Sequence, residues 1–211
     1  MLSRRALPVL LLFGLAAGCS AAPPLPAAGE LLAAAKTNFA AVRSLRFTVG
    51  VNGVLPGLPM TKLSGDMTLQ GKGAVSGRAE FVDRAFTFAV SGSTATTKDA
   101  KGHETTGSTA FTASRYLGPG GSLVELLGAL RQPQTEIREV IQQIDGYRVG
   151  GTLPRAVAAK LIPQIHSDVN VKVWVTVAEP RRFARMWLQV PPASERDSPV
   201  MYEVLLTDQQ P

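Results

Sequence analysis

The sequence predicts an α+β fold in which a mostly antiparallel β-sheet carries helices against one face. Segments with alternating apolar residues follow one another closely along the chain, which is typical of antiparallel strands with one solvated face. Three other segments place apolar residues at helical spacing. We expect about ten strands and three helices, and a twisted sheet of that size can curve around its helices as a half-barrel.

The first 18 residues have the layout of a secretory signal. Arg4 and Arg5 precede an apolar run over residues 6–15, which is shorter than the roughly 20 residues of a membrane-spanning helix. The run ends in "LAAGC", which resembles the lipobox of bacterial lipoproteins and contains the only cysteine, Cys19. We therefore expect cleavage before Cys19 and attachment of diacylglycerol to its sulfur; ordinary cleavage that leaves a free thiol is the alternative.

Residues 19–29 are predicted to be the lipidated cysteine and a flexible tether, because small residues and prolines dominate them. Residues 30–211 then form a single domain. Two acyl chains on Cys19 would hold this domain at the extracytoplasmic face of the cell membrane. Loss of Arg4 and Arg5 with the leader lowers the formal net charge from +6 to +4, a mildly basic balance that does not indicate nucleic acid binding.

The domain is expected to begin with a helix over residues 29–44. A second helix is expected over 119–130, where Ser122 and Glu125 have the spacing of a capping box, and a third over 154–162, with Pro154 at its first position. Strands are expected over residues 45–51, 63–70, 74–82, 85–90, 135–143, 147–152, 170–177, 183–190 and 200–206.

No catalytic or metal-binding motif stands out, so we expect neither an enzyme nor a cofactor. Nucleophile motifs are missing, and His103 and His166 lie in polar, loop-like contexts. The glycine-rich residues 118–122 precede a helix but lack the lysine of a phosphate loop. His, Cys, Asp and Glu residues show no metal-ligand spacing on an expected strand or helix.

Two further features leave alternatives open. Arg181, Arg182 and Arg185 either contact phosphate groups or form a charged hairpin turn. Gly65 and Gly77 fall on the apolar faces of expected strands, where they either leave room for a cavity or mark a bend in the sheet. These two interpretations of the glycines are compatible.

Three segments of the chain resemble the LppX/LprAFG lipoproteins of mycobacteria and their relatives. They are residues 41–68 with "LPGLP" and "LSGD", residues 121–154 with "QIDGYRV", and residues 171–190. The resemblance implies a strongly curved antiparallel half-barrel that encloses helices around a large apolar cavity for acylated lipids. It also implies that Ala79 and Phe81 line that cavity, and that a transporter of the major facilitator type is a possible partner.

We therefore expect a monomeric, non-catalytic lipoprotein that binds and transfers di- or triacylated lipids or glycolipids of the cell envelope. The competing interpretation is an envelope scaffold or assembly lipoprotein that binds a protein partner. The apolar strand and helix faces, together with the resemblance, give the expected cavity lining: Phe47, Val49, Met67, Ala79, Phe81, Phe88, Leu123 and Leu127.

Overall fold

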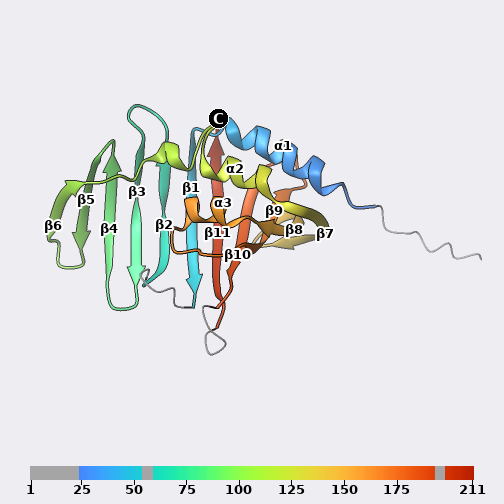
Figure 1. Ribbon diagram of the computed structural model, residues 1–211. Helices are drawn as coiled ribbons and strands as arrows, with labels where there is room; N and C mark the ends of the chain where they lie inside the picture. Colours follow the sequence, from blue (N-terminus) through green and yellow to red (C-terminus); the bar gives the residue numbers. More distant parts are fainter. Residues whose placement is uncertain (1–23, 54–58, 193–197) are drawn as a thin grey trace, which may run out of the picture.

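A computed structural model describes residues 24–53, 59–192 and 198–211 (Figure 1). The helices in these ranges are α1 (Ala28–Ala40), the short 3-10 helix η1 (Ala113–Arg115), α2 (Ser122–Ala129) and α3 (Arg155–Leu161). The strands are β1 (Ser44–Asn52), β2 (Met60–Thr68), β3 (Ala74–Phe81), β4 (Ala85–Ser91), β5 (Thr94–Asp99), β6 (Glu104–Ser108), β7 (Arg131–Ile141), β8 (Ile144–Leu153), β9 (Val169–Thr176), β10 (Phe183–Val190) and β11 (Val200–Gln210).

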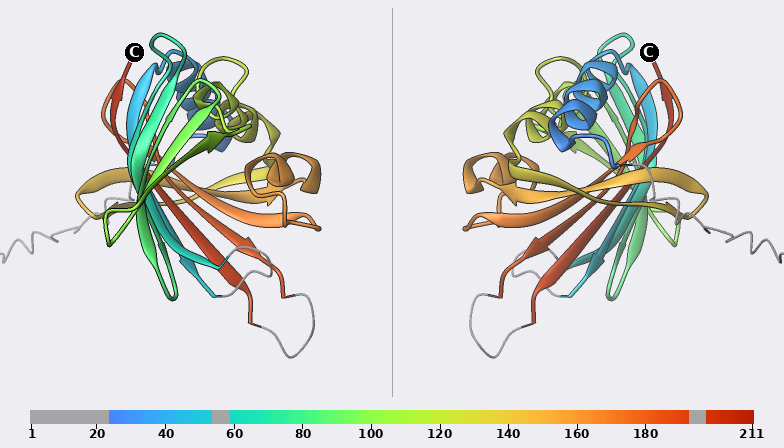
Figure 2. Two further views of the ribbon diagram at one scale, coloured as in Figure 1. Left: turned by 90° about the vertical axis from the view of Figure 1, so that its left-hand side faces the viewer. Right: turned by 90° about the vertical axis from the view of Figure 1, so that its right-hand side faces the viewer.

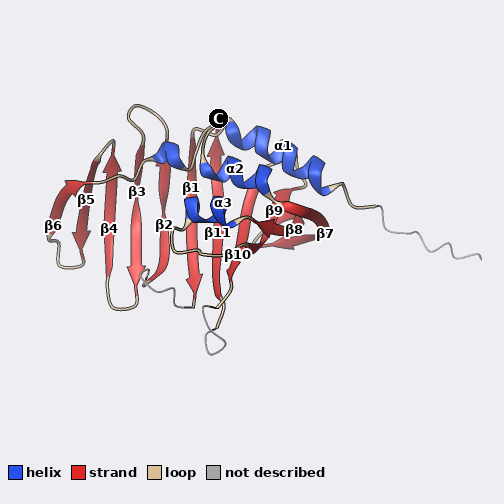
Figure 3. Ribbon diagram, viewed as in Figure 1, coloured by secondary structure: helices blue, strands red, loops and turns tan. Residues whose placement is uncertain are grey.

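The eleven described strands form one antiparallel sheet (Figures 1 and 3). Their order is β6-β5-β4-β3-β2-β1-β11-β10-β9-β8-β7, so most neighbours in the sheet are also neighbours in the chain. The exception is the central pair of β1 with β11, which joins the two ends of the domain. Between the edge strands β6 and β7 the chain crosses the sheet through η1 and α2.

The sheet is strongly twisted and curved. In Figure 2, β7 and β8 run steeply across the direction of β3 and β4, and all three α-helices lie on the concave side. Such coiling is the usual result of right-handed strand twist in a large sheet. The expected half-barrel with helices on one face is therefore confirmed.

The main core lies between the helices and one half of the sheet. α1 packs against α2 and against β7, β9 and β10. It does so because its apolar residues recur at helical spacing, which places them on one face. The fully or almost fully buried side chains of this core are Leu31, Ala35, Phe39, Leu126, Leu127, Val149, Leu153, Val171, Val173, Val175, Phe183 and Leu188.

The elements differ from the expectations in three details. β5 and β6 were not expected, because their threonine-rich sequences lack an apolar alternation. The capping box is absent as well: the N-cap of α2 is Gly121, and the Ser122 hydroxyl is buried without a hydrogen-bond partner among the described residues. Pro154 is the N-cap of α3 rather than its first helical residue.

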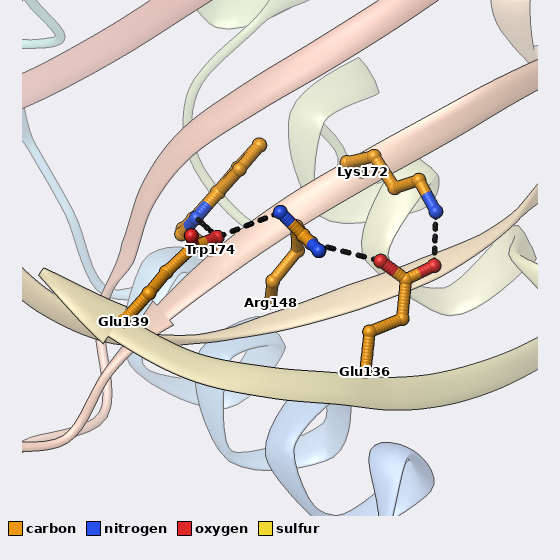
Figure 4. Close-up of polar contacts among 5 residues, drawn as sticks. All are labelled: Glu136, Glu139, Arg148, Lys172 and Trp174. Atoms are coloured by element: carbon orange, nitrogen blue, oxygen red, sulfur yellow. Dashed lines mark hydrogen bonds and ion pairs between the residues drawn. The ribbon is translucent and has the colours of Figure 1, made fainter. Parts of the chain in front are cut away.

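Charged side chains join β7, β8 and β9 (Figure 4). Arg148 donates hydrogen bonds to Glu136 at 2.8 Å and to Glu139 at 2.9 Å, and Glu136 also pairs with Lys172. Glu139 in turn accepts a hydrogen bond from the indole of Trp174 at 3.0 Å. Burial alone would raise the pKa of Glu136, but the hydrogen bonds from Lys172 and Arg148 outweigh it and lower the pKa below its usual value of 4.5.

Candidate functional site

An apolar cavity of about 370 Å³ lies on the concave side of the sheet, at the border of the helix-covered half. Its sheet wall comes from β1, β2, β10 and β11, and its cover comes from α2 and from the segments before α2 and after α3. The lining residues are Leu45, Phe47, Val49, Met60, Leu63, Met67, Phe111, Tyr116, Leu123, Leu161, Ile162, Pro163, Gln164, Met186, Tyr202, Val204 and Leu206.

The strand alternation explains why the sheet wall is apolar. Phe47 and Val49 are two residues apart on β1, so they face the same side of the sheet. Their cross-strand partners on β11 are Leu206 and Val204, respectively. Tyr202 is the next residue of β11 on that face, so one continuous apolar surface spans the two central strands.

The cover of the cavity consists mainly of irregular segments. Phe111 and Tyr116 stack on each other with ring centroids 5.2 Å apart on either side of η1. Leu123 of α2 adds an almost fully buried side chain. Residues 161–164, which begin at the last residue of α3, also line the cavity. The size of the cavity is at the lower end of the usual range for small-molecule sites, about 300 to 1,000 Å³.

The structure brings half of the expected cavity residues together. Phe47, Val49, Met67 and Leu123 line the cavity. Leu127 is only 2% exposed in the core between the helices and the sheet, and it is not among the residues that line the cavity.

The other three expected residues lie outside the lining on the neighbouring strands β3 and β4. Ala79 is 4% exposed and pairs with Leu63, which does line the cavity, and with Phe86. Phe81 stacks on Phe86 with a centroid distance of 5.4 Å, and Phe88 is half-buried. Cys19, the expected lipidation site, lies outside the described residues.

Sequence reasoning missed the contributions of β10, β11 and the two covering segments. Met186 lies in the expected strand "FARMWLQV", and Val204 and Leu206 alternate in "VMYEVLL", so the strand patterns were the signal that could have found them. Phe111 and Ile162 lie in irregular segments, where no periodicity marks a residue as part of a wall.

Gly65 and Gly77 face each other across β2 and β3. A Cβ atom on Gly65 would collide with the carbonyl oxygen of Ser76, and one on Gly77 would collide with that of Ser64. The close approach of the two backbones therefore requires glycine at both positions. Phe47 and Phe88 lie beside them in the same cross-strand row, an arrangement that compensates for the missing side chains.

Few polar atoms are enclosed near the cavity. Among the described residues, the Tyr202 hydroxyl and Oε1 of Gln164 are buried and have no hydrogen-bond partner, and both residues line the cavity. Desolvation raises the pKa of Tyr202 to about 12, and it also raises the pKa of Tyr116. Both phenols are therefore protonated at neutral pH and can donate hydrogen bonds.

The other candidate groups do not converge on this cavity. His103 lies at an exposed turn with its Nδ1 3.1 Å from Asp99, and His166 is exposed. Arg181 bonds to the carbonyl oxygens of Thr176 and Val177, which favours the hairpin-turn interpretation at this position.

Arg185 is separate from that turn. Its guanidinium lies 4.9 Å from the ring centroids of both Trp174 and Trp187, and it forms an ion pair with Glu203 at 2.6 Å.

Within the described ranges, no three His, Cys, Asp or Glu residues are grouped so that they can hold a metal ion. The helices of those ranges are also not long and apolar enough to span a bilayer.

An open antiparallel half-barrel with an apolar cavity on its concave side defines the class of the protein. Residues 27–204 match the family model of the LppX_LprAFG lipoproteins, and the chain belongs to this family. Among curated relatives, the lipoarabinomannan carrier protein LprG of Mycolicibacterium smegmatis is 26% identical over 178 residues, which are 77% of this chain and 75% of that protein.

Two solved structures share the fold. The lipoprotein LppX of Mycobacterium tuberculosis superposes with a TM-score of 0.67 at 19% identity, covering 85% of this chain and 94% of that one. LprF of Mycobacterium bovis superposes with a TM-score of 0.66 at 20% identity, covering 86% of this chain and 92% of that one.

Proposed function

We propose that this protein is a membrane-anchored lipoprotein that binds acylated lipids or glycolipids of the cell envelope and transfers them without chemical change. The observation that carries the proposal is the apolar cavity of about 370 Å³ on the concave side of the sheet. The carrier activity in the name of the LprG relative supports the same class of cargo.

The energetics of lipid transfer explain why such a cavity is useful. Moving an acyl chain of about 16 carbons into water costs on the order of 12 kcal/mol, at roughly 0.8 kcal/mol per methylene. Apolar walls such as Phe47, Val204 and Leu206 replace water around the chain. Exchange between a membrane and the cavity is then close to neutral in free energy.

We also propose that the protein acts at the membrane surface. Lipidation of Cys19 would hold the domain at the extracytoplasmic face of the cell membrane, and the residues after it would let the cavity reach the lipid surface. The protein would act as a monomer, and a transporter of the major facilitator type is the proposed partner for delivery. The described residues group no side chains for metal chemistry, and the proposal assigns no catalytic role to any residue.

The test is native mass spectrometry of the full-length chain purified from the membranes of an actinobacterial host, followed by organic extraction. A stoichiometric mass increment that extracts as a di- or triacylated lipid is expected. A folded protein that stays empty both after purification and after incubation with lipid vesicles would contradict the proposal, and cross-linking in the envelope would then test for a protein partner.

A further inference from the structure

The cavity wall contains a polar group that the protein itself leaves unsatisfied. Tyr202 is 1% exposed, and within the described residues its hydroxyl has no hydrogen-bond partner. Its cross-strand neighbours are Val51 on β1 and Leu188 on β10, neither of which has a polar side chain. Buried hydroxyl groups are normally hydrogen-bonded, so a native exception calls for a specific explanation.

A second unsatisfied atom belongs to the same cavity. Oε1 of Gln164, in the segment that follows α3, is buried and also lacks a partner among the described residues. The two atoms have complementary chemistry. The phenol of Tyr202 can donate a hydrogen bond, and an amide oxygen can only accept one. A ligand that satisfies both must offer an acceptor and a donor within an otherwise apolar molecule.

We infer that the Tyr202 hydroxyl donates a hydrogen bond to an ester carbonyl of the bound lipid, while Gln164 accepts one from a hydroxyl of the same lipid. Partly esterified glycerol has both groups next to its acyl chains. The inference rests on the proposed function and adds a preference: the cavity selects ester-linked lipids over ether-linked lipids of the same shape. An ether lacks the carbonyl oxygen, and its bridging oxygen lies at a different position and is more shielded by the two alkyl groups, so it is a poorer acceptor for the phenol.

The test is a competition between two lipids that differ only in this group. The full-length protein is incubated with vesicles containing equal amounts of dipalmitoylglycerol and dihexadecylglycerol, and native mass spectrometry gives the ratio of ester to ether lipid bound. For the unmodified protein we expect a preference for the ester of about 2-fold to 10-fold, the range that one hydrogen bond supplies. Tyr202→Phe should bring the ratio close to one.

Two matched variants separate the role of Tyr202 from general effects of losing a polar group. Tyr147→Phe also removes a phenol, but Tyr147 lies on β8 outside the cavity lining, so the ratio should stay unchanged. Gln164→Leu should lower the binding of both lipids about equally, because both carry the same free hydroxyl. Ratios are measured on loaded protein, so partial unfolding of a variant does not alter them.

The possible failures are distinguishable. If the unmodified protein binds neither lipid, the inference fails, and the lipid that co-purifies from the host decides the proposed function separately. If it binds both lipids equally, or if Tyr202→Phe keeps the ester preference, the inference fails and the proposed function stands. A loss of preference of the same size in Tyr147→Phe would also overturn the assignment to Tyr202.

Discussion

Strands β8–β11 and strands β4–β6 belong to one sheet but lie in very different surroundings. The first group is covered on its concave side by the helices, and residues such as Val173, Phe183 and Leu188 are completely buried there. In the second group every described residue is at least partly exposed, and all of β6 is exposed. The covered half therefore provides most of the hydrophobic stabilisation.

The cavity lies at the border between these two regions. Its wall includes β10 and β11 from the covered half and β2 from the side of the open strands. Beyond it, Ala79, Phe86 and Phe88 continue the apolar concave face without lining the cavity. One half of the sheet therefore contains most of the core, and the apolar cavity lies at the border of that half.

The largest expected effect comes from removing a core side chain of the covered half. Phe183 is fully buried and contacts Phe39 edge to face at 5.6 Å. Phe183→Ala should lower the free energy of unfolding by about 3 to 5 kcal/mol, measured by urea denaturation. Phe88→Ala, in the open region, is the matched control and should cost less than half as much. Equal losses would show that the two regions contribute alike to stability.

A smaller effect is expected where the two regions meet. Gly65→Ala places a methyl group against the Ser76 carbonyl and should lower the free energy of unfolding by about 1 to 3 kcal/mol. Gly107→Ala, on β6, meets nothing within 4 Å and should change stability by less than about 0.5 kcal/mol. Urea denaturation of both variants checks this, and a neutral Gly65→Ala would argue against a required close approach of β2 and β3.

The charged network on β7–β9 predicts a pH dependence. Because the folded pKa of Glu136 is lowered, its stabilising contribution is present above its unfolded pKa and is lost as the pH falls through the folded pKa. Glu136→Gln should therefore cost at most about 1 kcal/mol at pH 7, and the difference from the unmodified protein should shrink as the pH falls below the unfolded pKa of about 4.3 and vanish below the folded pKa. Urea denaturation of both proteins at several pH values measures this difference in stability. A difference that persists in acid would contradict an electrostatic role.

The smallest effect is expected in the open strands. The hydroxyl groups of Thr96 and Thr106 form an exposed cross-strand hydrogen bond of 3.1 Å. Thr96→Ala should change the free energy of unfolding by less than about 0.5 kcal/mol, within the range of most surface substitutions. A loss as large as that of Gly65→Ala would mean that β5 and β6 are more important for stability than their exposure indicates.

Much of the fold could be predicted because burial on one face leaves a period in the sequence. Leu45, Phe47 and Val49 alternate on β1, and the apolar residues of α1 recur at helical spacing. β5 and β6 were not predicted, for the opposite reason. Both are so exposed that neither face needs apolar residues, and a strand without a buried face has no hydrophobic period.

The candidate site was predicted only in part because it depends on pairing between distant strands. The alternation of Tyr202, Val204 and Leu206 is visible in the sequence, but the pairing of β11 with β1 is not. That pairing places the ends of the domain side by side. The cavity wall therefore includes β11, and it does not include Ala79 of β3 or Phe88 of β4. The covering segments have no period at all, since they are irregular.

The central claim is that the cavity holds the acyl chains of a lipid, and filling it tests that claim most directly. Val204 lines the cavity, whereas its neighbour Leu205 faces the other side of β11 and is the matched control. Lipid bound to the full-length Val204→Trp and Leu205→Trp proteins would be counted by native mass spectrometry, with circular dichroism to confirm folding. We predict that folded Val204→Trp loses most of its lipid while Leu205→Trp stays loaded. Full loading of folded Val204→Trp would contradict the account.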